Sequence, residues 1–225
     1  MRAASAPGRL HVVTDEVLQD RYTHLELARM AARGGADVVQ YREKRTVPIA
    51  ERIRVADSIV ESLRETGVDC VVDDHVEVAL ACGARGVHLG PGDLDPVAAR
   101  RRCGPTLWIG GTANDVDAAI RLAGAPVDYL GVGPVFGTGS KSDPAPELGL
   151  EALARIATRV EKPIIAIGGI TPETVAAVLE TGVHGIAVLS AVVCREDPAA
   201  ETARLREALE RFAATAPIDT AAGGR

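Results

Sequence analysis

The amino-acid sequence predicts an α/β fold, a single (β/α)₈ barrel of the TIM type, on three observations. Short β-branched runs alternate with longer segments of helical periodicity along the whole chain. Eight such runs can be counted, which is the strand number of the closed barrel. Glycines and polar residues gather directly after these runs, at the barrel end that carries active sites. An open doubly wound sheet would show the same alternation and is the alternative fold.

The eight expected strands are short and apolar, as in a sheet that is buried on both faces. They cover residues 10–14, 38–41, 70–72, 86–89, 107–110, 129–132, 164–167 and 185–189. The expected helices are rich in Ala, Leu, Arg and Glu, with apolar residues at helical spacing. They include residues 23–33, 49–65, 76–82, 116–123, 150–159, 172–180 and 199–213.

We expect one domain over residues 1–225, because no linker and no shift of composition divides the chain. The ordered core is expected at about 9–213, with flexible tails on either side. Residues 133–147 form the longest stretch without a strand or helix pattern. A loop of this length in a compact chain is usually functional or disordered.

Composition narrows the classes of function. Hydrophobic residues make up 47% of the chain, which is enough for one large core. A net charge of −6 and an aromatic content of 3% argue against nucleic acid as a partner. No apolar run reaches the length of a membrane span, and no secretory signal is evident. The four cysteines form no C-x-x-C pair, so we expect reduced thiols in a cytoplasmic protein, while a homo-oligomer stays open.

The second expected strand is followed by polar residues that suit a phosphorylated ligand. Side chains two positions apart in an extended chain share a face, so Gln40, Arg42 and Lys44 are expected to converge at the barrel mouth. An amide and two cations suit an oligophosphate, with arginine as a planar fork and lysine as a point charge. The alternative is a solvated loop of mixed charge.

Carboxylates follow the next two expected strands, with Asp73 and Asp74 after the third and Asp93 after the fourth. These strands are neighbours in a barrel, so Asp74 and Asp93 are expected to approach one another. Two carboxylates without a histidine or cysteine cluster favour Mg²⁺, which commonly takes one or two carboxylates together with phosphate oxygens. The alternative is helix capping, by the first two acids before Val76 and by Asp93 before Pro96.

Hydroxyl groups beside glycines follow the fifth and sixth expected strands. Thr112 stands after two glycines and can donate to a phosphate oxygen, although it or Asn114 is equally suited to cap the next helix. The loop after the sixth strand holds Thr138, Gly139, Ser140 and Lys141. Glycine lets a backbone approach a ligand closely, and two hydroxyls with a lysine suit a phosphate group. The alternative is a flexible hydrophilic loop.

The seventh and eighth expected strands lead into Gly168-Gly169 and Ser190. In this barrel the two loops commonly bind a phosphomonoester through backbone N–H groups and a helix N-terminus. Glycines that serve only a tight turn are the weaker alternative, since two such loops are adjacent. The sequence thus predicts two anion sites, as a reaction between two phosphorylated substrates requires. Among the histidines, His88 is expected to be a buried structural residue and His75 a neighbour of the site.

Six runs follow one another along the chain in a recognisable order: VQYREK, VDDHVEVALACGARGVHLGPGDL, WIGGT, DYLGVGPVFGTGSKSD, AIGGI and GIAVLSAV. From about Leu10 to Val193 their order and spacing resemble the thiamine-phosphate synthase family. The resemblance implies a (β/α)₈ barrel and a transferase. This family couples 4-amino-5-hydroxymethyl-2-methylpyrimidine diphosphate with 4-methyl-5-(2-hydroxyethyl)thiazole phosphate, and the products are thiamine phosphate and diphosphate.

The resemblance also implies roles for individual residues. The pyrimidine diphosphate would be held by Gln40, Tyr41, Arg42, Glu43, Lys44, Asp73, Thr112 and Lys141. The thiazole phosphate would be held by Thr138, Gly139, Ser140, Gly169, Leu189 and Ser190, beside Gly168. Asp74 and Asp93 would bind Mg²⁺. Asp73 departs from the family, in which asparagine is usual, and the aspartate adds negative charge beside a diphosphate.

The implied mechanism is dissociative. Arg42, Lys44 and Lys141 are the expected catalytic residues, because together with Mg²⁺ they would neutralise the departing diphosphate. Its departure leaves a pyrimidine methyl cation that the ring amino group stabilises. The thiazole nitrogen then attacks with its own lone pair, so no strong general base is needed and none is evident in the sequence. Positioning of the two substrates supplies much of the remaining catalysis.

Two other functions stay open on the sequence. A thiazole tautomerase is a similar barrel, but its proton transfer needs a group such as a histidine in the loop after the sixth strand, where this chain has the run GPV. The set of Asp74, Asp93 and Lys141 also favours the synthase. A non-catalytic binder of phosphorylated thiazole is the second alternative, and Asp73 is the residue that best supports it.

Overall fold

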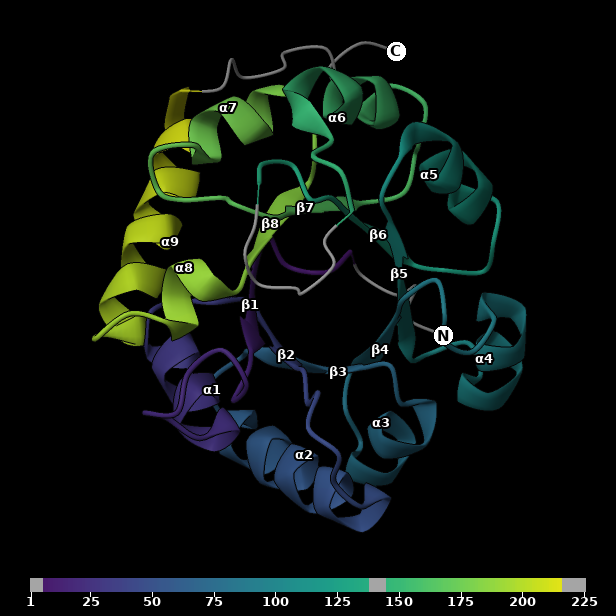
Figure 1. The fold of residues 1–225 in the computed structure, drawn as a ribbon, viewed down its shortest axis with the longest axis vertical. Helices are drawn as coiled ribbons and strands as arrows, with labels where there is room; N and C mark the ends of the chain where they lie inside the picture. Colours follow the sequence, from purple (N-terminus) through teal and green to yellow (C-terminus); the bar gives the residue numbers. More distant parts are fainter. Residues whose placement is uncertain (1–5, 138–144, 216–225) are drawn as a thin grey trace, which may run out of the picture.

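The chain folds into a closed barrel of eight parallel strands in a computed structural model that describes residues 6–137 and 145–215. Each strand pairs with its neighbours in chain order, and the first pairs with the last to close the sheet. Figure 1 shows the strands as an inner ring with the helices arranged around it. The fold class predicted from the sequence is confirmed.

Strands form the inner wall and helices the outer layer. The strands are β1 (Leu10–Thr14), β2 (Val38–Tyr41), β3 (Asp69–Asp73), β4 (Gly86–Leu89), β5 (Trp108–Ala113), β6 (Tyr129–Val132), β7 (Ile164–Ile167) and β8 (Gly185–Val188). The helices among the described residues are α1 (His24–Arg33), α2 (Ile49–Leu63), α3 (Val76–Cys82), α4 (Pro96–Cys103), α5 (Val116–Ala123), α6 (Gly149–Ala157), α7 (Val175–Glu180), α8 (Ser190–Val193) and α9 (Pro198–Thr215).

Most predicted elements lie at the expected positions, and the differences are local. β5 runs on to Ala113, so that Thr112 lies within the strand and not after it. α4 has no predicted bounds, although the capping alternative for Asp93 places a helix start at Pro96; the helix does begin there, with Asp95 as its N-cap. Strand ends in a barrel depend on the pairing of neighbours, here with β4 and β6, which no local pattern specifies.

Several predicted helix boundaries also differ by one to three residues, among them those of α7 and α9. α7 begins at Val175 and not at residue 172, because residues 172–174 form a turn in which the Thr174 hydroxyl donates to Thr171 O at 3.1 Å. α9 extends to Thr215, two residues beyond the expected core. The rest of the expected C-terminal tail lies outside the described residues.

Apolar side chains fill the N-terminal end of the barrel interior. Val38 of β2, Val71 of β3 and Trp108 of β5 pack together inside the sheet, beside Gly86 at the start of β4. Gly86 makes room for this group, since a Cβ there would lie 2.8 Å from Trp108 Cβ. The opposite end, at the C-terminal ends of the strands, is therefore the one that polar side chains can occupy.

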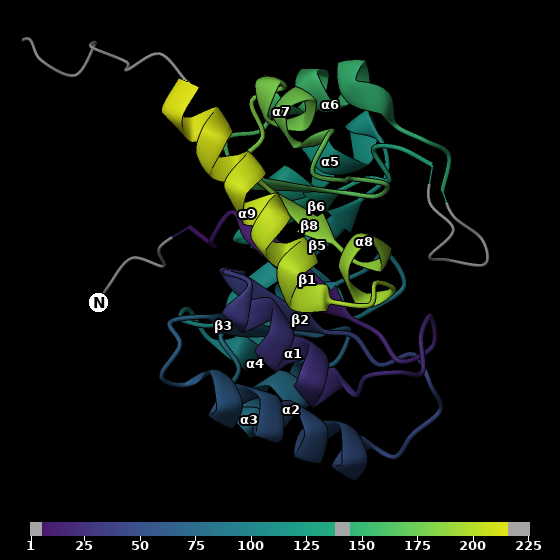
Figure 2. The same cartoon turned by 90° about the vertical axis from the view of Figure 1, so that its left-hand side faces the viewer.

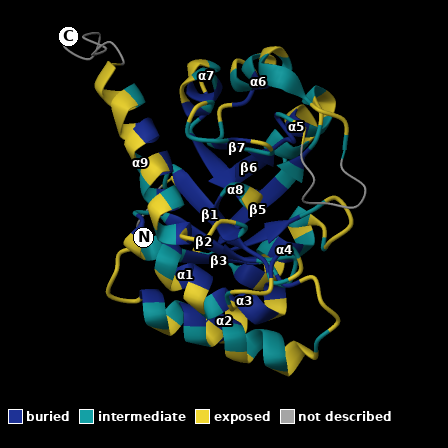
Figure 3. Ribbon diagram, turned by 60° about the vertical axis from the view of Figure 1, so that its left-hand side comes forward, coloured by how far each residue is buried: buried dark blue, intermediate teal, exposed yellow. Residues whose placement is uncertain are grey.

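The main hydrophobic core lies between the outer face of the barrel and the surrounding helices (Figure 3). The longest helix, α9, packs against α1, α7 and α8, and it lies along the side of the barrel in Figure 2. Through these contacts α9 connects the last helices of the outer layer to α1, the first. Among the residues that the structure describes, no helix is long and apolar enough to cross a membrane.

Candidate active site

A cavity of about 600 Å³ opens at the C-terminal ends of the strands. This volume lies within the range of small-molecule sites. Polar and charged residues from around the ring line it: His11, Gln40, Arg42, Lys44, Asp73, Asp74, His88, Asp93, Thr112, Asn114, Tyr129, Thr171, Ser190 and Arg195. Most of the residues predicted for the site therefore meet in one place.

The five residues predicted at the end of β2 alternate between the two faces of the strand. Gln40, Arg42 and Lys44 line the cavity. Tyr41 and Glu43 are buried and do not line it. The structure places these two side chains behind the barrel wall, so their predicted contact with the substrate has no support from their position.

Arg42 is held by a buried acid that the sequence analysis did not include. Its guanidinium pairs with Asp15, whose side chain is fully buried. The other oxygen of this carboxylate accepts hydrogen bonds from the backbone N–H of Val17 at 2.7 Å and of Leu18 at 2.9 Å. Because Asp15 is fixed on both sides, the arginine fork is oriented before any ligand binds.

The Asp73 carboxylate contacts both the side-chain amide of Gln40 and the ammonium group of Lys44. Its Oδ1 accepts from Gln40 Nε2 at 2.7 Å, and its Oδ2 lies 3.1 Å from Lys44 Nζ. Burial and the negative charge of Asp74 raise the pKa of Asp73, although Lys44 and Arg42 act in the opposite direction. Two cations thus partly balance an aspartate that is otherwise costly to bury.

Asp74 and Asp93 face each other at the edge of the cavity. Their carboxyl groups interact directly, and burial together with the charge of Asp74 raises the pKa of Asp93. Burial opposes ionisation of Asp74 as well, but its hydrogen bond with Lys44 lowers the pKa of this carboxyl. The N–H of Gly90 donates to Asp93 Oδ2 at 2.6 Å and orients it. The two acids therefore present their oxygens at one point, as the sequence predicts.

The backbone of Asp74 explains how its carboxylate reaches that point. Its φ of 65° lies in the left-handed region, which aspartate tolerates better than most residues. Its N–H donates to His88 O at 2.8 Å, so the turn is tied to the neighbouring strand. The chain therefore turns directly after β3, at the edge of the cavity.

The helix-capping alternatives are wrong for α3, α4 and α5. α3 begins after His75 and has no side-chain cap. Asp95 caps α4, and Asp115 caps α5. The residues named for these roles line the cavity instead: Asp73, Asp74, Asp93, Thr112 and Asn114.

His88 connects three strands inside the barrel. Its Nε2 lies 2.9 Å from Thr112 Oγ1, and its Nδ1 lies 3.1 Å from the hydroxyl of Tyr129. Gly131 leaves space for the imidazole, since a Cβ there would lie 2.8 Å from His88 Cε1. His88 is buried, as expected, but it also lines the cavity and orients the Thr112 hydroxyl.

The other side of the cavity is built by the loops after β7 and β8. Gly168 and Gly169 have φ values of 104° and 65°, which residues with a side chain rarely adopt. A Cβ at Gly169 would also lie 2.7 Å from Phe136 Cβ, in the loop after β6. Leu189 and Ser190 line the cavity beside these glycines. On the side of the β7 and β8 loops, the cavity is therefore lined by backbone atoms as well as by side chains.

The remaining predicted residues lie outside the described residues. They are Thr138, Gly139, Ser140 and Lys141. Pro134 and Ala145, on the two flanks of this segment, both line the cavity. The roles expected for the four residues stay predictions.

Several residues of the site are missing from the predicted set. The most consequential are His88 and Tyr129, which line the cavity, and Asp15, which holds Arg42 from behind it. Asp15 directly follows β1, a position equivalent to that of the predicted acids after β3. His88 and Tyr129 lie on β4 and β6, and strand alternation indicates that they face inward. Alternation does not tell how high in the barrel a side chain lies, because the strands of a barrel are staggered.

A model of the thiamine monophosphate synthase family matches residues 10–192. The chain belongs to this family. A thiamine-phosphate synthase of Salinibacter ruber is 44% identical over 209 residues, which cover 93% of this chain and 92% of the relative. One of Methanoculleus marisnigri is 46% identical over 198 residues, which cover 88% of this chain and 93% of the relative. This member of the thiamine monophosphate synthase family is therefore an enzyme of the transferase class.

The fold of this synthase-family member also resembles that of a solved relative. The thiamine phosphate pyrophosphorylase of Pyrococcus furiosus superposes with a TM-score of 0.83 at 38% sequence identity. The match covers 91% of this chain and 96% of that one. The barrel is thus shared along almost the full length of both proteins.

Proposed function

We propose that this enzyme condenses 4-amino-5-hydroxymethyl-2-methylpyrimidine diphosphate with 4-methyl-5-(2-hydroxyethyl)thiazole phosphate to give thiamine phosphate and diphosphate. One observation carries the proposal: a cavity has two cations beside an acid pair on one side and two adjacent loops, one with paired glycines, on the other. The first side suits a diphosphate with a divalent ion, and the second suits a phosphomonoester. The thiamine-phosphate synthases among the relatives are consistent with this reaction.

Asp74 and Asp93 fit Mg²⁺ as ligands. Their carboxyl groups interact directly, and burial together with the charge of Asp74 raises the pKa of Asp93, so a cation between them would stabilise both in the ionised form. Carboxylate oxygens are the hard ligands that Mg²⁺ prefers, and two of them leave coordination positions for water or phosphate oxygens. When bound, the ion would supply a Lewis acid for the leaving diphosphate.

The side chains of the enzyme bind and neutralise the diphosphate. Arg42 and Lys44 face the cavity and are oriented by acids, Arg42 by Asp15 and Lys44 by Asp73. Their charges stabilise the negative charge that develops when the bond between the pyrimidine methylene carbon and the bridging oxygen breaks. The thiazole nitrogen attacks that carbon with its lone pair, so no residue has to remove a proton. Holding both substrates in one cavity lowers the entropic part of the barrier.

Product formation tests the proposed function. Purified protein incubated with both substrates and Mg²⁺ should form thiamine phosphate and diphosphate in equal amounts, and EDTA should stop the reaction. A thiazole tautomerase would instead isomerise a thiazole carboxylate phosphate, and a binding protein would retain the thiazole phosphate without turnover. The proposal fails if no thiamine phosphate appears with both substrates and Mg²⁺ present.

Asp73→Asn should keep the turnover of the wild type and lower KM for the pyrimidine diphosphate. The amide retains an oxygen that can accept from Gln40, and it removes a negative charge beside the diphosphate. Removing a like charge at a partly screened site contributes about 1 kcal/mol, or a roughly fivefold lower KM. Steady-state kinetics with the pyrimidine diphosphate as the varied substrate measure this effect. A collapse of turnover would mean that the carboxylate has a role of its own, for instance as a further metal ligand.

Lys141→Ala should slow the departure of diphosphate by about 100-fold, because one cation that neutralises the leaving group is lost. Rapid-quench measurement of diphosphate in a single turnover separates this step from product release. Lys162→Ala is the matched control, since Lys162 donates to Val127 O at 2.8 Å and does not line the cavity. Unchanged single-turnover rates in Lys141→Ala would remove this lysine from the site.

We also propose that the enzyme works in the cytoplasm, in line with the expectation from its cysteines. Cys70, Cys82, Cys103 and Cys194 are free thiols. Burial raises the pKa of Cys70 and Cys82, so these two thiols stay protonated and unreactive. Free, unreactive thiols suit a reducing compartment.

A further inference from the structure

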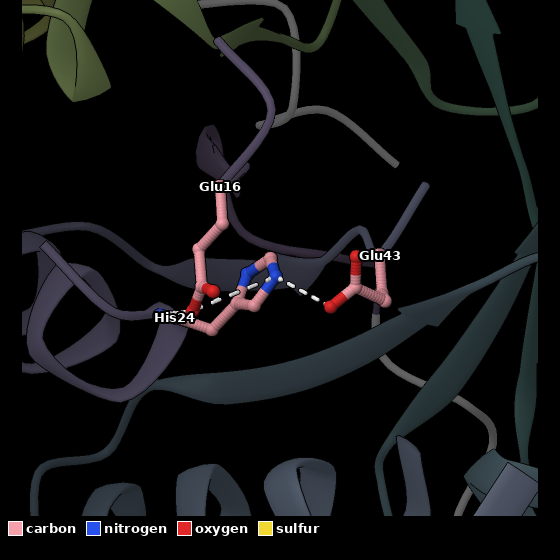
Figure 4. Close-up of side chains that lie close together, drawn as sticks. All are labelled: Glu16, His24 and Glu43. Carbon is pink, nitrogen blue, oxygen red and sulfur yellow. Dashed lines mark hydrogen bonds and ion pairs between the residues drawn. The ribbon is translucent and has the colours of Figure 1, made fainter. Parts of the chain in front are cut away.

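Three side chains that commonly bind metals converge behind the barrel wall, away from the cavity. Glu16 follows β1, His24 is the first residue of α1, and Glu43 follows β2. One ligand atom from each residue lies within 4.8 Å of the other two. In Figure 4 the imidazole lies between the two carboxylates, which approach it from opposite sides. None of the three residues lines the active-site cavity.

His24 presents a buried nitrogen atom without a hydrogen-bond partner. Its side chain is fully buried, and its Nδ1 lies 2.8 Å from Thr14 Oγ1. When the Thr14 hydroxyl donates to Gln40 O, which lies 3.4 Å away, it accepts from Nδ1–H of His24. In that tautomer Nε2 carries a lone pair, and Nε2 has no hydrogen-bond partner. Nε2 lies 3.4 Å from Glu43 Oε2 and 3.9 Å from Glu16 Oε1.

Three acceptors that converge in a largely buried space repel one another unless donors or a positive charge lie between them. Glu16 Oε1 accepts from the backbone N–H of His24 at 2.6 Å, which relieves part of this repulsion. Arg45 balances the two carboxylates from the outer side, with Nη1 2.6 Å from Glu16 Oε2 and Nε 2.9 Å from Glu43 Oε1. It does not donate to Nε2, so the ion pairs leave the imidazole nitrogen unsatisfied.

We propose that Glu16, His24 and Glu43 form a binding site for a divalent transition-metal ion of the zinc class. An imidazole with two carboxylates is a donor set for Zn²⁺, whereas Mg²⁺ takes oxygen ligands. Two ligand atoms at about 2.0–2.1 Å from a tetrahedral ion lie about 3.4 Å apart, which matches the 3.4 Å between Nε2 and Glu43 Oε2. The Thr14 hydroxyl on Nδ1 is the kind of partner that metal-bound histidines have.

The position of the cluster suggests what a bound ion would do. It would join the segment after β1, the start of α1 and the segment after β2. Glu43 stands between Arg42 and Lys44 in the chain, and these two side chains face the cavity. An ion on the outer side would therefore fix the backbone that carries Arg42 and Lys44.

Metal titration tests the site. The full-length protein is stripped with EDTA, returned to excess Mg²⁺ so that all-oxygen sites are occupied, and titrated with Zn²⁺ in a calorimeter. We expect uptake of about one Zn²⁺ per chain. Co²⁺ as a second probe should give the visible bands of a tetrahedral nitrogen and oxygen site. No Zn²⁺ uptake by the wild type, or a cobalt–thiolate band in the near ultraviolet, would overturn the proposal.

Variants assign the ion to the cluster. His24→Gln should weaken Zn²⁺ binding about 100-fold or more, because a ligand is lost. His184→Gln is the matched control and should bind like the wild type, since His184 lies just before β8 and contacts Pro7 O at 2.7 Å. Glu16→Gln alters the most exposed of the three ligands and gives a second test, with circular dichroism to report the fold. Wild-type affinity in folded His24→Gln or Glu16→Gln would overturn the assignment.

Discussion

Asp93→Ala should lower kcat by about 100-fold to 1,000-fold even with Mg²⁺ in excess, because one of the two carboxylates that meet at the cavity edge is lost. A loss of this size corresponds to roughly 3–4 kcal/mol of transition-state stabilisation. Asp74 would then face the diphosphate with its hydrogen bond from Lys44 but without the second carboxylate. Initial rates with both substrates over a range of Mg²⁺ concentrations measure the effect. They should also show a weaker apparent affinity for Mg²⁺.

Asp95→Ala is a matched control for this variant, only two positions along the chain. Asp95 Oδ1 accepts from Val97 N at 2.9 Å and from Ala98 N at 3.2 Å, and the side chain does not line the cavity. Losing this cap should cost about 1 kcal/mol of stability and lower the melting temperature without changing kcat. A wild-type rate in Asp93→Ala would contradict the metal assignment. An equal loss in both variants would trace the effect to the fold of the loop.

The barrel is predictable from the chain because most of its signals are local. Apolar runs of strand length, followed by segments of helical periodicity, define β1 to β8 without knowledge of the neighbours. α4 shows where this fails. It contains three consecutive arginines, and only Ala99 and Cys103 of its eight residues are buried, so its apolar periodicity is weak. Its position is set by the Asp95 cap and by packing, and packing cannot be seen in a single segment.

Which residues share the cavity is predictable in part, for a geometric reason. Parallel strands end at one edge of the sheet, so residues in the turns that follow them, such as Asp74 after β3 and Asp93 after β4, meet there. The same geometry turns Tyr41 and Glu43 away, although a family resemblance treats the whole run after β2 as one group. The pairing of Arg42 with Asp15 joins positions 27 residues apart, and no local pattern indicates such a partner.

Arg42→Ala should lower kcat/KM for the pyrimidine diphosphate by about 100-fold to 1,000-fold, since a preoriented cation at the leaving group is lost. Arg42→Lys should recover part of the loss, because lysine keeps the charge but not the planar fork. The variant also leaves Asp15 buried without its cation, which costs about 3–5 kcal/mol of stability. Kinetics and melting curves therefore have to be measured together, at a temperature where the variant is folded.

Arg45→Ala separates the loss of kcat/KM from the loss of stability. Arg45 is the equivalent cation on the outer side of the segment after β2. It pairs with Glu43, which is buried like Asp15 although slightly less deeply, but it does not line the cavity. Both variants should lose stability, since each leaves a buried carboxylate unpaired. Only Arg42→Ala should lose kcat/KM when both proteins are folded. If Arg45→Ala loses as much activity as Arg42→Ala, the arginine in the cavity acts through the fold and not through the diphosphate.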